Sequence, residues 1–374
     1  MKTAIRQNLE RLEREGNKRI IPHPCNTPGL IDFSSNDYLG IATDKELRRE
    51  FFDNLNAEDV MMSASASRLL AHCQEPFADF EATLKDAYRR EALIFNSGYH
   101  ANVGLVSALA TGDCTIIADK LVHASIIDGI KLSGAPFERF RHNDMRHLST
   151  LAKKVVAQGR RPLIIVESVY SMDGDKAPLD EIADIKKGCP GALLYVDEAH
   201  AVGVEGPSGL GMSMSLGKRS EEVDIIIGTL GKALGSTGAY AMTGRTIRDW
   251  AVNKARSLIF STALPPINVM WSKFIFLKSL EMDARRIHLK KLGKTLGAAL
   301  GSGSESHIQP FMIGDPHSAV RMSEALRRDG FEVLPIRTPT VPPGTDRLRI
   351  SLSASMNMAD VEGLAKSIKN YRDE

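Results

Sequence analysis

Several features that would assign this 374-residue sequence to a specialised class of protein are absent from it. No apolar run reaches the roughly 20 residues that a membrane-spanning helix requires, and the sequence contains no internal repeat or low-complexity tract. The net charge is only +2, and 48 Lys and Arg residues are interspersed with 46 Asp and Glu residues, so the basic stripe of a nucleic-acid-binding protein is missing. We therefore expect a globular protein that binds neither membranes nor nucleic acids.

Cysteine is scarce, and its spacing shows no metal-binding or redox pair. The four cysteines are Cys25, Cys73, Cys114 and Cys189. They form no Cys-x-x-Cys motif, which predicts reduced thiols in a cytoplasmic protein. Residues 1–16 combine charged and regularly spaced aliphatic side chains, a pattern typical of an amphipathic helix and not of a secretory signal. Both patterns favour a cytoplasmic location.

An ordinary composition, 43% apolar and 25% charged, is combined with a regular alternation of strands and helices. Between residues 92 and 243, short apolar runs alternate with helical stretches, which predicts βαβ units and a mainly parallel sheet covered by helices. The candidate strands are Leu93–Asn96, Thr115–Ala118, Phe137–Arg141, Leu163–Glu167, Leu193–Asp197, Asp224–Gly228 and Ala239–Thr243. The last two are too close in sequence for a crossover helix, so one antiparallel edge strand is expected.

The C-terminal part of the chain has a different pattern. After residue 265 a long helix is expected as far as about residue 300, with a break near Gly293 and Gly297. A strand, a helix, two strands and a helix then predict a small α+β unit. These elements are expected at His307–Ile313, Pro316–Arg328, Phe331–Ile336, Leu348–Ser353 and Met358–Tyr371. The expected domains are an N-terminal helix and strand (1–44), a large domain (45–264) and a long helix with a smaller domain (265–374).

The stretch around Lys232 is the most informative part of the sequence. A β-branched run ends at Gly228, and only three residues separate it from Lys232 in a glycine-rich turn. A strand this apolar is expected to be buried on both faces, and ligands of open α/β sheets bind beyond the carboxyl ends of the strands. Lys232 is therefore a candidate for catalysis, although most lysines in turns are simply solvated.

Polar side chains also follow other candidate strands. Ser97-Gly98-Tyr99 lies between a strand and a helix, where backbone N–H groups favour an anion such as phosphate. Asp197 and His200 follow a buried strand, and His123 begins a helix. Each of these residues alone is more simply explained as a helix cap, a packed ring or part of an ion pair. Together with Lys232 they match pyridoxal phosphate, which needs a Schiff-base lysine and an acid beside its pyridine nitrogen.

Two other kinds of site fit the same residues less well. Asp197 and His200 lack further ligands at the spacing of a metal site, so no metal is expected. A P-loop is excluded because Gly228 is too close to Lys232 and because Ala233 stands where Ser or Thr would bind magnesium.

Several stretches, in the same order along the chain, resemble the α-oxoamine synthases, which are pyridoxal phosphate enzymes of fold type I. The matching stretches are Ser34–Gly40, Ser97–Tyr99, His123–Ser125, Ser171–Asp175, Val196–His200, Gly228–Lys232 and Arg347–Ile350. The resemblance covers nearly the whole chain. It implies an α/β fold of the type I transferase class, with a mainly parallel seven-stranded sheet in a large domain and a smaller α+β domain.

The resemblance implies catalytic roles for four residues. Lys232 would hold the cofactor covalently and later move the Cα proton of the substrate, and Asp197 would pair with the protonated ring nitrogen. His200 would bond the phenolic oxygen of the cofactor, and His123 would stack on its ring and assist proton transfer.

A phosphate-binding set is implied as well. The backbone N–H groups of Gly98 and Tyr99, next to Ser97, would hold the phosphate together with the hydroxyl of Thr229. Thr262 would reach the same phosphate from the neighbouring subunit of a homodimer whose active sites lie at the subunit interface.

Four further residues are implied to lie near the ring or the substrates. Ser171 would lie near the cofactor ring, Arg349 would hold the amino acid carboxylate in a charge-assisted pair, and Asn36 would line the substrate pocket. Arg19 would lie near the distal carboxylate of the acyl chain, with a solvated arginine after a helix as the alternative.

The implied reaction is a decarboxylative condensation of an amino acid with an acyl thioester. The resemblance is strongest to family members that join L-alanine to a pimeloyl thioester, carried by coenzyme A or a carrier protein, in biotin biosynthesis. Three alternatives remain open on the sequence alone. They are a relative that uses glycine and a short acyl thioester, an aminotransferase with the same Lys and Asp pair, and a non-enzymatic scaffold protein.

The sequence departs from the family pattern at three places. Residues 63–66 replace a glycine-rich run, Phe77 replaces a common histidine, and the segment between Arg19 and Leu30 is short. All three places lie near the acyl entrance in the family, so they bear on the acyl substrate more than on the cofactor.

Overall fold

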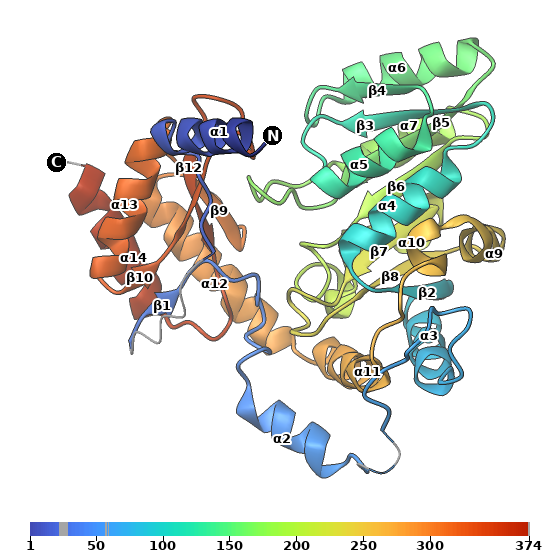
Figure 1. The fold of residues 1–374 in the computed structure, drawn as a ribbon, viewed down its shortest axis with the longest axis horizontal. Helices are drawn as coiled ribbons and strands as arrows, with labels where there is room; N and C mark the ends of the chain where they lie inside the picture. Colours follow the sequence, from blue (N-terminus) through green and yellow to red (C-terminus); the bar gives the residue numbers. More distant parts are fainter. Residues whose placement is uncertain (22–28, 57, 59, 373–374) are drawn as a thin grey trace. The chain divides into compact units, whose positions relative to one another are not determined.

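The computed structural model describes residues 1–21, 29–56, 58 and 60–372, and the chain forms two compact units (Figure 1). The small unit consists of Met1–Tyr38, Ser171–Gly174 and Ile287–Glu374, and the large unit consists of Leu39–Tyr170 and Asp175–Arg286. Within the described ranges, no helix combines the length and the apolar character needed to cross a lipid bilayer.

Among the described residues, a seven-stranded sheet forms the centre of the large unit, in the order β2-β8-β7-β6-β5-β3-β4. Its central strands carry β-branched and aliphatic residues that are buried on both faces. The strands are β2 Glu91–Phe95, β3 Cys114–Asp119, β4 Phe137–Phe140, β5 Arg161–Glu167, β6 Leu193–Asp197, β7 Ile225–Thr229 and β8 Ala239–Thr243. Every strand expected between residues 92 and 243 is present, which confirms the predicted fold class.

The antiparallel strand occupies a different place from the one predicted. β8 is antiparallel to β7, as expected, but it is not an edge strand, because β2 pairs with its other side. β2 thereby satisfies backbone groups that would otherwise be exposed along β8. The prediction of an antiparallel edge strand is therefore wrong. Strands β4, β3, β5, β6 and β7 run parallel to one another, so the sheet is mainly parallel, as expected.

Helices pack against this sheet (Figure 1). α4 (Gly98–Leu109) and α5 (Ala124–Ser133) lie side by side, and their apolar side chains share one core cluster with alternate residues of the strands. Neighbouring strand residues such as Ile117 and Val166 point to the opposite face and are also fully buried. The other helices of this unit are α2 Lys45–Asp53, α3 Glu75–Tyr88, α6 Met145–Ala157, α7 Leu179–Lys187, η2 Pro207–Gly209, α8 Met212–Ser215, η3 Gly217–Glu222, α9 Arg245–Lys254, α10 Arg256–Ile259 and α11 Pro266–Leu280.

Short strands and amphipathic helices form the small unit. Here β1 pairs in parallel with β10, while β11, β12 and β9 form an antiparallel sheet in this order. The single strand expected over residues 331–336 is divided at Val333, because its two halves pair with different partners. The elements are α1 Lys2–Arg14, β1 Ile31–Asp32, α12 Asp283–Leu300 (which begins in the large unit), β9 Ile308–Met312, α13 Pro316–Arg328, β10 Phe331–Glu332, β11 Leu334–Ile336, β12 Arg347–Ser351 and α14 Met358–Arg372.

The long helical stretch is interrupted earlier than expected. The break between α11 and α12 falls between residues 280 and 283, whereas Gly293 and Gly297 lie inside α12. The two glycines allow the backbone of residues 304–306 to lie against the helix, since a Cβ at Gly297 would be 2.0 Å from the carbonyl oxygen of Ser304. The predicted break at the glycines is therefore wrong, and these positions serve close packing.

Candidate active site

The carboxyl ends of the strands bring several predicted residues to one edge of the large sheet. β2 leads into Ser97, β3 into His123, β6 ends with Asp197, and β7 is followed by Lys232. β2 points in the same direction as β7 because both are antiparallel to β8. Ligands of open α/β sheets bind at this edge, so it is the candidate active site of the large unit.

Lys232 is presented by the turn that follows β7. Its Nζ lies 2.7 Å from Nε2 of His200, a residue that is only 4% exposed. A hydrogen bond between these two nitrogens requires one of them to act as acceptor, so the amine and the imidazole cannot both be fully protonated. The amine and the imidazole are thus close enough to share one proton, and a lysine must lose a proton before it reacts.

Asp197 places a buried carboxylate at the end of β6. Its Oδ1 accepts a hydrogen bond from the backbone N–H of Ala199 at 2.9 Å, and its Oδ2 accepts one from Nδ2 of Asn102 at 2.7 Å. Within the described part of the chain, no Lys, Arg or His nitrogen forms an ion pair with Asp197. Because a buried carboxylate is costly without a cation, this position suits a positively charged ring nitrogen.

His123 is the N-cap of α5. The backbone N–H of Ser125 donates to its Nδ1 at 3.2 Å, and the hydroxyl oxygen of Ser125 lies 2.7 Å from the same nitrogen. The pKa of His123 is lowered, mainly because surrounding protein atoms displace water from the ring; Asp197 partly opposes this change, and Lys232 adds to it. His123 therefore lies within electrostatic reach of both residues.

The loop between β2 and α4 has the form expected of a phosphate site. Ser97 is the N-cap of α4, and its Oγ accepts a hydrogen bond from the N–H of His100 at 3.2 Å. Gly98 and Tyr99 occupy the first turn, where N–H groups have no acceptor within the helix. Thr229 of β7 is adjacent, since a Cβ at Gly98 would lie 3.8 Å from its Oγ1. The helix start and this hydroxyl together can bind an anion such as phosphate.

These groups fit pyridoxal phosphate on chemical grounds. Lys232 supplies a primary amine, Asp197 supplies a buried carboxylate without a cationic partner among the described residues, and Gly98 opens a phosphate-binding helix start. In the same described residues, no group of three or more His, Cys, Asp or Glu side chains is arranged to hold a metal ion.

Arg349 on β12 lies in the small unit and is held by neutral groups. Its Nε donates to the carbonyl oxygen of Ser171 at 2.6 Å, its Nη1 to the hydroxyl of Ser351 at 2.6 Å, and its Nη2 to the hydroxyl of Tyr38 at 3.4 Å. Tyr38 in turn donates to Oδ1 of Asn36 at 2.9 Å. Arg349 is 4% exposed and forms no ion pair with a carboxylate among the described residues. The structure therefore brings the predicted residues Arg349, Ser171 and Asn36 together.

Arg19 lies in another part of the small unit. Its side chain is exposed, and its Nη2 donates to the hydroxyl of Thr340 at 2.8 Å. Burial and the nearby charge of Arg19 both lower the pKa of Arg337, a residue that the sequence analysis does not single out. The carboxylate of Asp346 also lies near Arg337 and partly offsets the two positive charges.

Two buried polar residues of the large unit, Asn102 and Glu198, are not predicted from the sequence. Glu198 is fully buried and accepts hydrogen bonds from the hydroxyls of Ser168 and Ser213; burial raises its pKa, and these donors partly oppose that rise. Asn102 could have been noticed as an amide within an apolar helix, and Glu198 as the neighbour of Asp197. Their partners, however, come from distant parts of the sequence.

The departures from the family pattern have visible structural consequences. Ser65 adopts a left-handed backbone with φ of +52°, the conformation that glycine takes most easily, and its N–H donates to the hydroxyl of Ser63 at 3.0 Å. Phe77 is buried, and the guanidinium carbon of Arg68 lies 4.4 Å from its ring centre. Most of the shortened segment, residues 22–28, lies outside the described residues.

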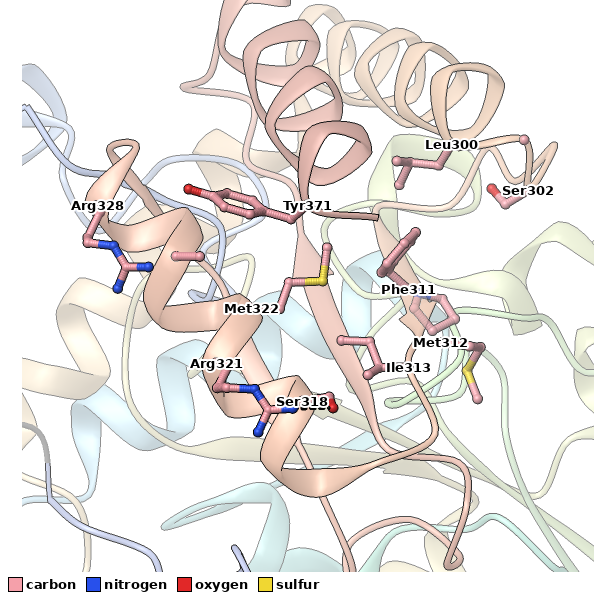
Figure 2. Close-up of a pocket in the computed structure, with 13 residues that line it drawn as sticks. Leu300, Ser302, Phe311, Met312, Ile313, Ser318, Arg321, Met322, Arg328 and Tyr371 are labelled. Carbon is pink, nitrogen blue, oxygen red and sulfur yellow. Dashed lines mark hydrogen bonds between the residues drawn. The ribbon is translucent and has the colours of Figure 1, made fainter. Parts of the chain in front are cut away.

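A pocket of about 940 Å³ in the small unit contains none of the predicted site residues. Figure 2 shows Arg321, Met322 and Arg328 on α13, with Phe311 and Met312 of β9 across the pocket from them. Pocket size therefore does not identify the active site, which is defined by the chemistry at the strand ends.

Comparison with known proteins identifies the family. The family described as aminotransferase class I and II matches residues 28–368, and the chain belongs to it. The fold is that of the type I pyridoxal phosphate transferases, as predicted from the sequence.

The most similar relatives narrow this class to the α-oxoamine synthases. The chain is 46% identical over 351 residues to a putative 8-amino-7-oxononanoate synthase of Pasteurella multocida, covering 92% of this chain and 90% of that protein. It is 44% identical over 374 residues to the 8-amino-7-oxononanoate synthase of Haemophilus ducreyi, covering 96% and 95%. These comparisons confirm the predicted family.

Solved structures agree with this assignment. Serine palmitoyltransferase of Sphingomonas wittichii superposes with a TM-score of 0.88 at 28% identity, covering 98% of this chain and 96% of that one. The 8-amino-7-oxononanoate synthase of Francisella tularensis gives a TM-score of 0.72 at 29% identity, covering 92% and 99%. A further serine palmitoyltransferase structure, solved with pyridoxal phosphate, gives a TM-score of 0.88 at 27% identity.

Proposed function

We propose that the protein condenses L-alanine with a pimeloyl thioester to form 8-amino-7-oxononanoate, CO2 and a free thiol in biotin biosynthesis, with pyridoxal phosphate as cofactor. Cα of alanine loses its proton and forms a bond to the thioester carbonyl carbon, and the thiol leaves. The alanine carboxyl group is then lost as CO2, and a proton returns to Cα. The observation that carries the proposal is the contact of 2.7 Å between Lys232 and His200 at the sheet edge that also bears Asp197.

The candidate site residues of the large unit each have a defined task in this reaction. The amine of Lys232 binds the cofactor and later takes the proton from Cα of alanine. The bound cofactor supplies an electron sink for the electrons left at Cα. Asp197 would keep the ring nitrogen of the cofactor protonated, His200 would orient Lys232 and bond the phenolic oxygen, and His123 would cover the ring. Ser97, Gly98, Tyr99 and Thr229 hold the phosphate.

The substrate carboxylates are assigned to residues of the small unit. Arg349, whose partners are neutral, binds the carboxylate of alanine, and Asn36 and Ser171 fix the surroundings of its guanidinium group. Arg19 and Arg337 attract the distal carboxylate of the pimeloyl chain, because two neighbouring cations favour an anion between them.

We further propose that the enzyme is a homodimer in which Thr262 contacts the phosphate of the partner subunit. Thr262 is exposed, and its backbone bridges to Ser67. The surrounding segments expose large apolar side chains: Met62 is 71%, Leu70 73% and Phe260 70% exposed. A second copy of the chain that covers these side chains would remove apolar surface from water.

A cytoplasmic location is proposed from the state of the cysteines. Cys73, Cys114 and Cys189 are buried free thiols, and burial raises the pKa of Cys114 to about 11. Such thiols are protected from oxidation and need no oxidising compartment. The fourth cysteine, Cys25, lies outside the described residues.

The proposed function is tested by thiol release from purified protein loaded with pyridoxal phosphate. L-alanine and glycine are each paired with pimeloyl and acetyl thioesters, and the thiol is measured with a chromogenic reagent. We expect release with alanine and pimeloyl thioester and none from the Lys232→Ala variant. Lys153→Ala, which removes an exposed lysine of α6, is the matched control and should retain wild-type activity.

Other outcomes would overturn the proposal in distinct ways. Release only with glycine and the acetyl thioester would keep the family and replace the substrates. Formation of pyridoxamine phosphate with alanine alone, without thiol release, would identify an aminotransferase.

A further inference from the structure

Asn102 connects two residues of the active site that sequence analysis treats separately. It lies on α4, is 1% exposed, and makes three hydrogen bonds. Its Nδ2 donates to Oδ2 of Asp197 at 2.7 Å and to the hydroxyl of Ser125 at 2.9 Å, while its Oδ1 accepts from the hydroxyl of Tyr195 at 2.6 Å. The hydroxyl of Ser125 lies 2.7 Å from Nδ1 of His123. A continuous chain of hydrogen bonds therefore joins Asp197 to His123.

The orientation of the Asn102 amide follows from these partners. A carboxylate can only accept hydrogen bonds, so the amide nitrogen, not the oxygen, must face Asp197. The reverse orientation would place the amide oxygen against the carboxylate oxygen at 2.7 Å. With the observed orientation, both N–H donors and the oxygen of this buried amide are satisfied, which makes the connection rigid.

The same chain determines which nitrogen of His123 carries the proton. Nδ1 caps α5 by accepting the backbone N–H of Ser125, so it cannot be a donor. The Ser125 hydroxyl accepts from Asn102 and has one hydrogen left, which it can donate to Nδ1 at 2.7 Å. Neutral His123 therefore carries its proton on Nε2.

We propose that Asn102 is a positioning residue that holds the Asp197 carboxylate in place for the cofactor and, through Ser125, fixes His123 as its Nε2–H tautomer. The proposal deepens the proposed function and rests on it for the role of Asp197 toward the cofactor. His123 then offers an N–H donor from Nε2 and no free acceptor, so it can give a hydrogen bond or a proton at that atom but cannot take one while neutral. Protonation at Nδ1 would remove the acceptor of the Ser125 N–H and would force the Ser125 hydroxyl to turn from donor to acceptor, so the network opposes it.

The tautomer is tested first, in cofactor-free protein, by ¹⁵N NMR of labelled histidine. Wild-type His123 should show the Nε2–H tautomer and titrate below its usual range. In both Asn102→Leu and Ser125→Ala, we expect a mixture of tautomers and a higher pKa of His123. Ser125→Ala removes the hydroxyl that donates to Nδ1, and Asn102→Leu removes the amide that orients this hydroxyl. Asn253→Leu, on the surface helix α9, is the matched control and should leave His123 unchanged. An unchanged tautomer and pKa in both variants would overturn the link to His123.

The second measurement is the equilibrium dissociation constant of pyridoxal phosphate. Asn102→Leu should weaken binding at least tenfold, because Asp197 loses its side-chain donor, whereas Ser125→Ala keeps that donor and should stay within about twofold of the wild type. Equal affinities for wild type and Asn102→Leu would overturn the link to Asp197. If Asn102→Leu does not fold, as judged by circular dichroism, Ser125→Ala still tests the tautomer. Failure of the wild type to bind the cofactor would instead overturn the proposed function, while the tautomer result would stand.

Discussion

Two buried side chains of opposite charge, Asp197 and Arg349, are each held by neutral groups. Asp197 accepts hydrogen bonds from an amide side chain and a backbone N–H, and Arg349 donates to hydroxyls and a carbonyl. Neutral partners satisfy the geometry of a charge without cancelling it. Each residue therefore keeps most of its charge for a ligand, Asp197 for a cation and Arg349 for a carboxylate.

Replacing Arg349 should impair amino acid binding more than cofactor binding. A hydrogen bond to a charged group contributes about 1.5–3 kcal/mol, so Arg349→Ala should raise the KM for alanine about 10- to 100-fold. The absorbance of the bound cofactor should be retained. The KM of Arg349→Lys for alanine should lie between those of the wild type and Arg349→Ala, because lysine keeps the positive charge but loses the planar guanidinium group. Arg321→Ala, which removes an exposed arginine of α13, is the control and should keep the wild-type KM. An unchanged KM in Arg349→Ala would show that another residue binds the carboxylate.

The protonated side chain of His142 contributes stability that the protein loses at alkaline pH. Its Nδ1 lies 2.9 Å from Asp119 and its Nε2 lies 2.7 Å from Asp175. Desolvation lowers the pKa of His142, but the two carboxylates outweigh it and raise the pKa from 6.5 to about 10. The folded state thus binds the proton more tightly than the unfolded state, so this contribution is complete below pH 6.5 and is lost as the pH rises toward about 10.

The measurement is the free energy of unfolding in urea between pH 6 and 10. The wild type should lose more stability over this range than His142→Gln, and the difference between the two curves isolates the histidine from other titrating groups. His72→Gln, at an exposed position, should follow the wild type. Parallel curves for wild type and His142→Gln would contradict the prediction.

At the level of single residues, sequence analysis finds the groups that perform chemistry but not the groups that hold them. Lys232, Asp197 and His200 stand out because each lies at the end of an apolar strand or within three residues of it. Asn102 and His142 do not stand out, because their partners lie 95 and 33 residues away and only folding brings them together.

Among the strands, β7 illustrates how packing determines the position of a reactive turn. Gly228 faces Tyr240 of β8, whose hydroxyl lies 2.8 Å from that of Tyr88 in the core. A Cβ at Gly228 would lie 2.2 Å from Cζ of Tyr240. This glycine therefore lets the strand before Lys232 approach an aromatic layer.

Gly228→Ala should destabilise the protein by about 1–3 kcal/mol, the usual range for overpacking a core. The melting temperature and urea unfolding measure this loss. Gly244→Ala is the matched control, because no atom lies within 4 Å of the added Cβ, and it should change stability by less than about 0.5 kcal/mol. Gly228→Ala combined with Tyr240→Leu should recover part of the loss. Equal stability of the two alanine variants would show that the strands move apart without cost.

Elements were predictable where local patterns dominate. The runs of β-branched residues identify the central strands, and Asp44, Asp144 and Asp315 mark helix starts that the structure shows as side-chain caps. The interior place of β8 and the helix break between residues 280 and 283 depend on tertiary partners that no local pattern records.

For the whole molecule, the proposed dimer predicts complementation between two inactive variants. Lys232→Ala lacks the reactive amine, and Thr262→Asp places a negative charge against the phosphate of the partner subunit. A mixed dimer would contain one intact site, so random pairing of equal amounts should restore about a quarter of wild-type activity. Co-expression with separate affinity tags, followed by an activity assay, measures this recovery. Activity no higher than that of the separate variants would contradict a shared site.

The division of the small unit between the two ends of the chain has a consequence for protein synthesis. The pairing of Ile31 with Phe331 joins a segment to a partner that is synthesised about 300 residues later. At about 5–20 residues per second, β1 waits roughly 15–60 s for its partner, while nearly all of the large unit has already emerged. A chain that terminates early therefore carries a complete large sheet and an unpaired N-terminal strand. The pairing of β1 with β10 can therefore form only after translation has reached the elements near residue 331.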